Sequence, residues 1–240
     1  MIDYKDGDQM PCMRMKITGR TEDIFVSKFG GVGYIPHDGS FPVDNEGRQL
    51  RFLAQIDCSK VTLPEYPKSG LLQFWILNDD VYGMDFDNQT NQNTFRVIYY
   101  PTVDNTVTRD EVISKIVKHD WDDYEYGMPI EDNGEFAVEI YESISTYYDF
   151  SDEKYDYLDE DPEDYGGHMI GGIPVFTQED PRWQEDLQDY DYLLFQMDSD
   201  YKEDEYVIMW GDSGVCNFFI RTENLKACDF SDVLYNWDCC

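Results

Sequence analysis

The chain has 240 residues, and its 18 lysines and arginines against 51 aspartates and glutamates give a formal net charge of −33. A charge this negative repels nucleic-acid phosphates and anionic lipid headgroups, which excludes nucleic-acid and membrane-surface binding as first hypotheses. Hydrophobic residues at 41% and aromatic residues at 16% supply enough apolar surface for a folded core, which a disordered acidic chain lacks.

The start of the chain bears on the compartment. Asp3, Asp6 and Asp8 lie where a secretion signal needs basic residues and then an apolar run. No stretch of the sequence approaches the roughly 20 apolar residues of a membrane span. These features predict a cytoplasmic protein. Its six cysteines form no pair at metal-ligand spacing, so free thiols are expected, with no metal and no cofactor.

The first recognisable elements lie in residues 27–77. Gly30 and Gly31 indicate a tight turn or a backbone with positive φ. A phosphate-binding loop would open a helix and carry a third glycine or a lysine, whereas this run continues into Pro36, so a structural turn is expected. Apolar and β-branched runs predict strands over residues 53–57 and 74–77.

The segment of residues 79–164 adds a strand, a helix and an acidic band. Residues 95–100 predict a strand, and the capping box of residues 108–111 predicts a helix to about His119. Residues 151–164 carry eight acidic side chains against one lysine. This band is expected to be an exposed linker, with a docking surface for a basic protein or a weak divalent-cation site as the functional alternatives.

A second glycine pair, Gly171 and Gly172, begins a repeat of the first pattern. Gln196 follows Gly172 by 24 positions, as Gln55 follows Gly31, and residues 214–220 match residues 70–76 in type. Three matched blocks in the same order predict an internal duplication.

The predicted fold class is therefore α+β, a strand-rich single body built from two copies of one β-rich unit with an inserted strand and helix. The copies are expected at about residues 27–77 and 168–222, with the insertion at about 79–164. A helical tail is expected over residues 222–240. Short helical turns are predicted at Asp180 and Ser231, which have the character of N-caps.

No catalytic signature is complete. Residues 211–214 have the letters found around a chymotrypsin-type nucleophile, but none of the three histidines has that family's flanking residues, so a turn is expected. Cys216 lies inside an apolar strand, where a thiol is usually inert packing. These observations favour a protein without catalytic activity, and they leave an enzyme open as the alternative.

Six segments match a known family, namely residues 27–31, 53–57, 70–74, 82–100, 168–172 and 210–214. The length of the matching run at residues 82–100 makes the match specific. From about Ser27 to its C-terminus the chain resembles the YwqG-like family of uncharacterised bacterial proteins. The resemblance implies a cytoplasmic protein without an established activity. Some members are suspected immunity proteins against secreted toxins, and the family supplies no catalytic residues.

Two functions follow from these observations. The first is a non-enzymatic protein-binding module, of immunity type, that neutralises a basic partner, because complementary charge speeds encounter and aromatic side chains anchor interfaces. The alternative is an enzyme or small-ligand binder with a site between the two copies, formed by Gln55, Asp57, Gln196 and Asp198. In the structural interpretation these four side chains end strands and bond to the backbone.

Overall fold

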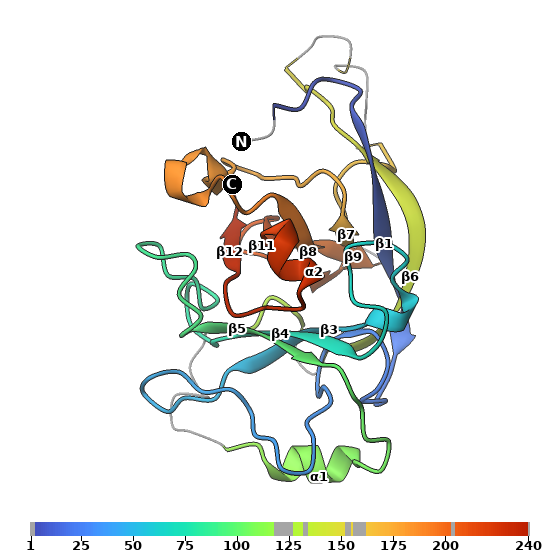
Figure 1. The fold of residues 1–240 in the computed structure, drawn as a ribbon, viewed down its shortest axis with the longest axis vertical. Helices are drawn as coiled ribbons and strands as arrows, with labels where there is room; N and C mark the ends of the chain where they lie inside the picture. Colours follow the sequence, from blue (N-terminus) through green and yellow to red (C-terminus); the bar gives the residue numbers. More distant parts are fainter. Residues whose placement is uncertain are drawn as a thin grey trace.

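The computed structural model describes residues 3–117, 127–131, 134–151, 155, 162–202 and 205–239. Ten strands form one antiparallel sheet in the order β12-β11-β8-β7-β1-β6-β2-β3-β4-β5, and two more form a separate hairpin (Figure 1). The strands of the large sheet are β1 (Gln9–Arg20), β2 (Lys28–Gly30), β3 (Arg51–Asp57), β4 (Leu71–Ile76), β5 (Phe95–Tyr100), β6 (Glu135–Thr146), β7 (Met169–Gly171), β8 (Tyr192–Asp198), β11 (Val215–Ile220) and β12 (Leu234–Asp238). The hairpin consists of β9 (Asp200–Lys202) and β10 (Glu205–Ile208).

The centre of the sheet is the long antiparallel pair of β1 and β6, each of 12 residues. Beyond β6 the neighbouring strands in the sheet are β2, β3, β4 and β5, in that order. Beyond β1, on the other side, they are β7, β8, β11 and β12. Met13, Met15 and Ile17 of β1 alternate with Arg14 and Lys16, which is the period expected of a strand with one face on a core.

The sheet curls until its two edge strands approach one another. The backbone N–H of Tyr235 in β12 donates to the carbonyl of Gln89, which precedes β5, at 3.0 Å. The rings of Phe95 in β5 and Tyr235 lie 5.1 Å apart. Because β5 and β12 are not paired as strands, the barrel-like sheet is nearly closed, and we call the boundary between them the seam.

Strands from the two halves of the sheet contribute side chains to one aromatic core. Phe74 of β4 lies 4.7 Å from Phe195 of β8 and 4.9 Å from Phe218 of β11, measured between ring centroids. A second cluster, which includes Trp75 of β4 and Val112 of α1 (Arg109–Ser114), covers the opposite face of β4. All six residues of β4 are buried, which explains why its sequence is a continuous apolar run rather than an alternation.

The predicted α+β class is wrong, because the structure is dominated by one sheet. Helix in the described residues is limited to α1 (Arg109–Ser114), α2 (Thr222–Lys226) and three-residue 3-10 turns. The predicted arrangement of two copies with an inserted strand and helix is also overturned. The supposed insertion supplies β5 at one edge of the sheet and β6 at its centre, so it is part of the same sheet.

Several of the predicted local elements are confirmed. The strands over β3, β4 and β5 are confirmed, and Thr108 caps α1 by accepting the N–H of Glu111 at 3.2 Å. The α-helix ends at Ser114, earlier than predicted, and residues 118–126 lie outside the described part. Asp180 caps a 3-10 turn as predicted.

The C-terminal part of the chain contains less helix than predicted. Ser231 begins a bend rather than a helical turn, and the predicted helical tail is helical only over α2, because β12 follows it. Most of the acidic band of residues 151–164 lies outside the described residues.

Candidate functional site

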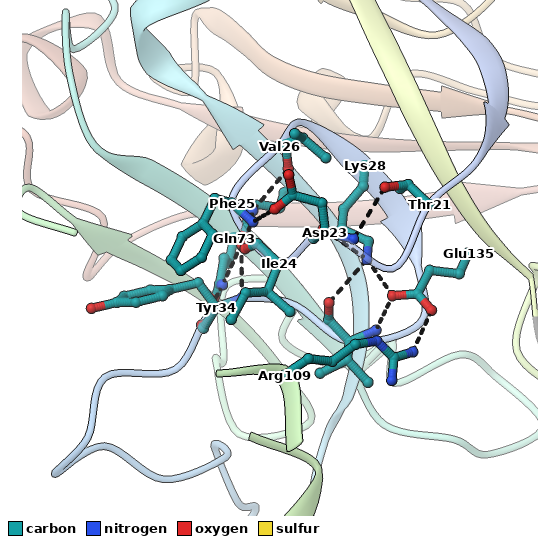
Figure 2. A network of polar contacts seen from close by, with 12 residues as sticks. Thr21, Asp23, Ile24, Phe25, Val26, Lys28, Tyr34, Gln73, Arg109 and Glu135 are labelled. Carbon is teal, nitrogen blue, oxygen red and sulfur yellow. Dashed lines mark hydrogen bonds and ion pairs between the residues drawn. The ribbon is translucent and has the colours of Figure 1, made fainter. Parts of the chain in front are cut away.

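Gln55 is fully buried, and its amide is satisfied by the protein itself. Its Oε1 accepts the backbone N–H of Tyr34 at 3.0 Å and the Nε2 of Gln73 at 2.8 Å. Its Nε2 donates to the carbonyls of Ile24 and Val26 at 3.0 and 2.8 Å. Figure 2 shows Ile24, Val26, Tyr34 and Gln73 gathered in this network. The side chain therefore faces backbone groups of the 24–34 loop.

Asp57 ends β3 and caps the 3-10 turn that follows it. Its Oδ1 accepts the backbone N–H of Ser59 at 3.0 Å and the Ser59 hydroxyl at 2.7 Å. Its own N–H donates to the hydroxyl of Ser27 at 2.9 Å. These contacts match the structural interpretation of this residue.

Gln196 repeats the arrangement of Gln55 on the other side of the sheet. It is fully buried, its Oε1 accepts the N–H of Val175 at 2.9 Å, and its Nε2 donates to the carbonyl of Gly167 at 2.8 Å. Asp198 accepts the N–H groups of Gly167 and Ser199 at 2.8 and 2.9 Å, and it also lines a cavity. The structure does not bring these two residues together with Gln55 in one pocket.

The four glycines of the two turns have left-handed backbones. Their φ angles are 67° at Gly30, 70° at Gly31, 65° at Gly171 and 79° at Gly172. A Cβ on Gly31 would lie 2.3 Å from the side chain of Glu135. The turn therefore has no room for another residue, since close approach and positive φ both require glycine here.

That glutamate belongs to a buried charged cluster that the sequence analysis missed. Lys28 is fully buried, and its Nζ donates to Glu135 and to the carbonyl of Val32, the latter at 3.0 Å (Figure 2). Nη2 of Arg109 at the start of α1 donates to the other oxygen of Glu135 at 2.6 Å. The cluster ties β2, β6 and α1 together, and a lysine next to a predicted glycine turn was its one visible signal.

A cavity of about 990 Å3 lies along β1, and we call it the β1 groove. Its lining holds four of the chain's 18 basic residues and five acidic ones, namely Arg14, Lys16, Arg20 and Lys202, and Glu131, Glu163, Asp198, Asp200 and Glu205. The ratio of basic to acidic side chains is thus far higher than in the whole chain. Two partly exposed tyrosines, Tyr141 and Tyr201, also line it.

His168 lines this groove, and each of its two ring nitrogens contacts a neighbouring group. Nδ1 accepts the backbone N–H of Asp198 at 3.0 Å, so in the neutral ring the proton is on Nε2. Nε2 faces a carboxylate oxygen of Asp200 at 3.5 Å, and this contact lowers the pKa of Asp200. A histidine held on both sides in this way is a positioning element rather than an open base.

The residues considered for nucleophilic chemistry have structural surroundings. Ser213 has a φ of 60° in a turn, and its hydroxyl contacts the Tyr201 hydroxyl at 2.7 Å. Cys216 is fully buried, and desolvation raises its thiol pKa well above the usual value. A protonated thiol in an apolar strand is a poor nucleophile.

The most exposed large apolar side chain among the described residues is Phe86, at 68% exposure. It lies in the loop of residues 77–94 between β4 and β5, which we call the Phe86 loop. This loop contains four aspartates and no lysine or arginine, and two of the aspartates, Asp85 and Asp87, flank the phenylalanine. The loop extends outward near β12 in Figure 1.

The Phe86 loop is held by hydrogen bonds from β12 and by a turn at its own tip. Nε1 of Trp237 donates to the carbonyl of Val81 at 2.7 Å, and the hydroxyl of Tyr235 donates to the carbonyl of Tyr82 at 3.0 Å. At the tip, Asp85 accepts the N–H groups of Asp87 and Asn88, both at 3.1 Å. An exposed aromatic ring between two carboxylates is thus presented on an ordered support.

Comparisons with known proteins give one assignment. Among the curated proteins no sequence matches the chain. A family model described as a domain of unknown function, DUF1963, matches residues 27–239. Residues 9–20 of β1 precede the matched region, although they complete the sheet between β6 and β7. No helix among the described residues is long and apolar enough to cross a membrane. Since the match covers most of its length, the chain belongs to the DUF1963 family.

Proposed function

We propose that this protein is a non-enzymatic binding protein of YwqG-like type whose Phe86 loop docks a basic protein partner. The observation that carries the proposal is Phe86 itself, exposed at 68% and flanked by Asp85 and Asp87 on an ordered loop. Aromatic side chains dominate the energetics of interfaces, and surrounding carboxylates select a basic surface. Because the loop is already held by β12, little conformational entropy is lost on binding.

An immunity-type role is the specific form of this proposal. A protein of net charge −33 would neutralise a basic toxin by covering its positive surface, and electrostatic steering would make the encounter fast. A cytoplasmic location belongs to the same proposal, since the five cysteines in the described part are free thiols.

The test starts with affinity capture of partners from the native host, followed by titration of the captured protein in rising sodium chloride. We expect a basic partner whose affinity falls with salt and weakens at least tenfold in Phe86→Ala, in line with an aromatic anchor worth about 1.4 kcal/mol or more. Trp183→Ala is the matched control, because it removes another exposed aromatic ring, at 56% exposure, outside the loop. A partner that is not basic, or binding unaffected by salt and by Phe86→Ala, would overturn the proposal.

The second candidate is a small-ligand binder that uses the β1 groove. The specific observation is a cavity of about 990 Å3 in which lysines and arginines nearly balance acids. Native mass spectrometry of protein purified from its host would show a retained ligand, which Lys16→Ala at the groove should weaken and Lys5→Ala outside it should not. A protein that carries no extra mass and binds its partner through Phe86 would exclude this candidate.

A further inference from the structure

β5 is an edge strand of the large sheet, and alternate backbone groups point away from its neighbour. The N–H of Leu77 donates to the carbonyl of Thr94 at 2.7 Å, so residues 94, 96, 98 and 100 face β4. The backbone groups of Phe95, Val97 and Tyr99 therefore face the seam. An edge of this kind is a template for an additional strand.

One side chain already imitates such a strand. Oε1 of Gln92 accepts the outward N–H of Val97 at 2.9 Å, and its Nε2 donates to the carbonyl of Phe230 at 2.8 Å. The amide of Gln92 thus makes the two hydrogen bonds that a peptide group would make between β5 and the 228–231 segment. Within the described part of the chain, the N–H of Tyr99 and the carbonyls of Val97 and Tyr99 have no such partner.

The space next to these groups fits a polypeptide backbone. A cavity of about 830 Å3 lies along residues 96–99 of β5, with Phe230 and Ser231 on its other side. Asn45, Asn91 and Asn93 also line it, and side-chain amides bind peptide groups without regard to sequence. The rings of Tyr99 and Phe230 lie 5.5 Å apart and form an apolar wall.

We infer that the seam binds an extended, basic segment of the partner as an additional strand against β5. This inference rests on the proposed function and names the chemistry of the docked segment. The Phe86 loop, which carries four aspartates, runs directly into β5, and the charged side chain in the lining of the cavity is Arg96. Backbone hydrogen bonds supply the affinity, and the net charge of −33 attracts a segment that carries lysine and arginine.

The probe is the capped heptapeptide acetyl-Lys-Val-Lys-Val-Lys-Val-Lys-amide, added to the isotope-labelled full chain and followed by NMR. We expect a Kd on the order of 100 μM, as is reasonable for one short added strand. The amide of Tyr99 should exchange quickly with solvent in the free protein and at least tenfold more slowly in the complex. The amide of Ile98, which faces β4, should be protected in both states.

Variants on both sides of the contact separate backbone recognition from side-chain effects. Tyr99→Pro removes the outward N–H, and a proline is tolerated at such an edge position. Binding should weaken at least tenfold. Tyr99→Val is the matched control, because it removes the same ring but keeps the N–H, and it should bind at least threefold more tightly than Tyr99→Pro. If Tyr99→Pro does not fold, two peptides test the same hydrogen bonds on the unaltered protein, one N-methylated at its three valines and the other at its four lysines, because alternate residues of a strand face one neighbour.

The outcomes are decisive in either direction. Binding of both N-methylated peptides as tight as that of the parent peptide, shifts confined to the β1 groove, or no binding at millimolar peptide would overturn the inference and leave Gln92 as a cap that blocks the edge. A glutamate version of the peptide that binds as well as the lysine version would overturn its charge selectivity. The proposed function would survive these results if Phe86→Ala still weakened the native partner, so the two failures are distinguishable.

Discussion

The side-chain oxygen of Gln55 accepts the backbone N–H of Tyr34, and that of Gln196 accepts the backbone N–H of Val175. In each case the donor lies three residues after a Gly-Gly pair. Both glutamines are fully buried. Each side-chain amide therefore supplies the hydrogen bonds that water would otherwise make to backbone groups of the turn next to the sheet. The matched blocks of the sequence thus encode a local device that fastens a loop to the strand behind it.

Replacing either glutamine should destabilise the fold. Gln55→Ala leaves the N–H of Tyr34 and the carbonyls of Ile24 and Val26 without their partner, and it opens a cavity. A loss of about 3–5 kcal/mol in the free energy of unfolding is expected from urea denaturation, with a similar loss for Gln196→Ala. Gln188→Ala, at an exposed position, should change it by less than about 0.5 kcal/mol. Equal effects at buried and exposed positions would contradict this role.

Glu135 should make stability depend on pH. Burial by itself raises its pKa, but the hydrogen bonds from Lys28 and Arg109 lower the pKa below its ordinary value of 4.5. A carboxyl with a lowered pKa stabilises the folded state above the unfolded-state value, and that contribution is lost as the pH falls through the folded-state value.

The corresponding variant is Glu135→Gln, compared with the parent by urea denaturation between pH 3 and 7. At pH 7 it should be less stable by about 3–5 kcal/mol, because the buried Lys28 loses its counter-charge. The difference should begin to shrink below about pH 4.5, where the unfolded parent takes up a proton, and it should be smallest once the pH has fallen through the lower folded-state pKa. Glu139→Gln, at an exposed position on the same strand, should show no such dependence. A difference that stays constant with pH would rule out the proposed linkage.

Gly31→Ala and Gly47→Ala separate backbone strain from steric overlap. Both glycines have positive φ, 70° and 83°, so each alanine costs about 1–2 kcal/mol in conformation. At Gly47 no atom lies within 4 Å of the new Cβ, whereas at Gly31 the Cβ lies 2.3 Å from the Glu135 side chain. Thermal unfolding should show a markedly larger loss for Gly31→Ala. Equal losses would mean that Glu135 moves aside freely.

Salt should stabilise the protein. A net charge of −33 implies self-repulsion in the compact state, and at 0.1 M salt the screening length of about 10 Å relieves it. The melting temperature should rise as sodium chloride increases from 10 to 300 mM, with sodium sulfate at equal ionic strength as the comparison. A melting temperature that is unchanged or lower would show that local pairing or bound cations already compensate the acids.

The sequence by itself determined the local elements and the charge. Apolar and β-branched runs marked β3, β4 and β5, the capping box marked the start of α1, and the paired glycines marked turns with positive φ. These features depend on residues close together in the chain, so local physics specifies them. The alternation of Met13, Met15 and Ile17 with Arg14 and Lys16 is also a strand signal, and it marks β1, which the prediction from continuous apolar runs does not include.

Tertiary structure alone decided the fold class and the placement of the sites. Gln9 of β1 pairs with Thr146 of β6, 137 residues away, and no local pattern states which strand will be the neighbour. That pairing turns the supposed insertion into the centre of one sheet. The folded sheet also places the side-chain amides of Gln55 and Gln196 in hydrogen bonds with backbone groups. In the same sheet β5 is an edge strand next to the Phe86 loop. Strand pairing is chosen by the burial of whole faces and by the closure of the sheet, which are properties of the folded chain rather than of any segment.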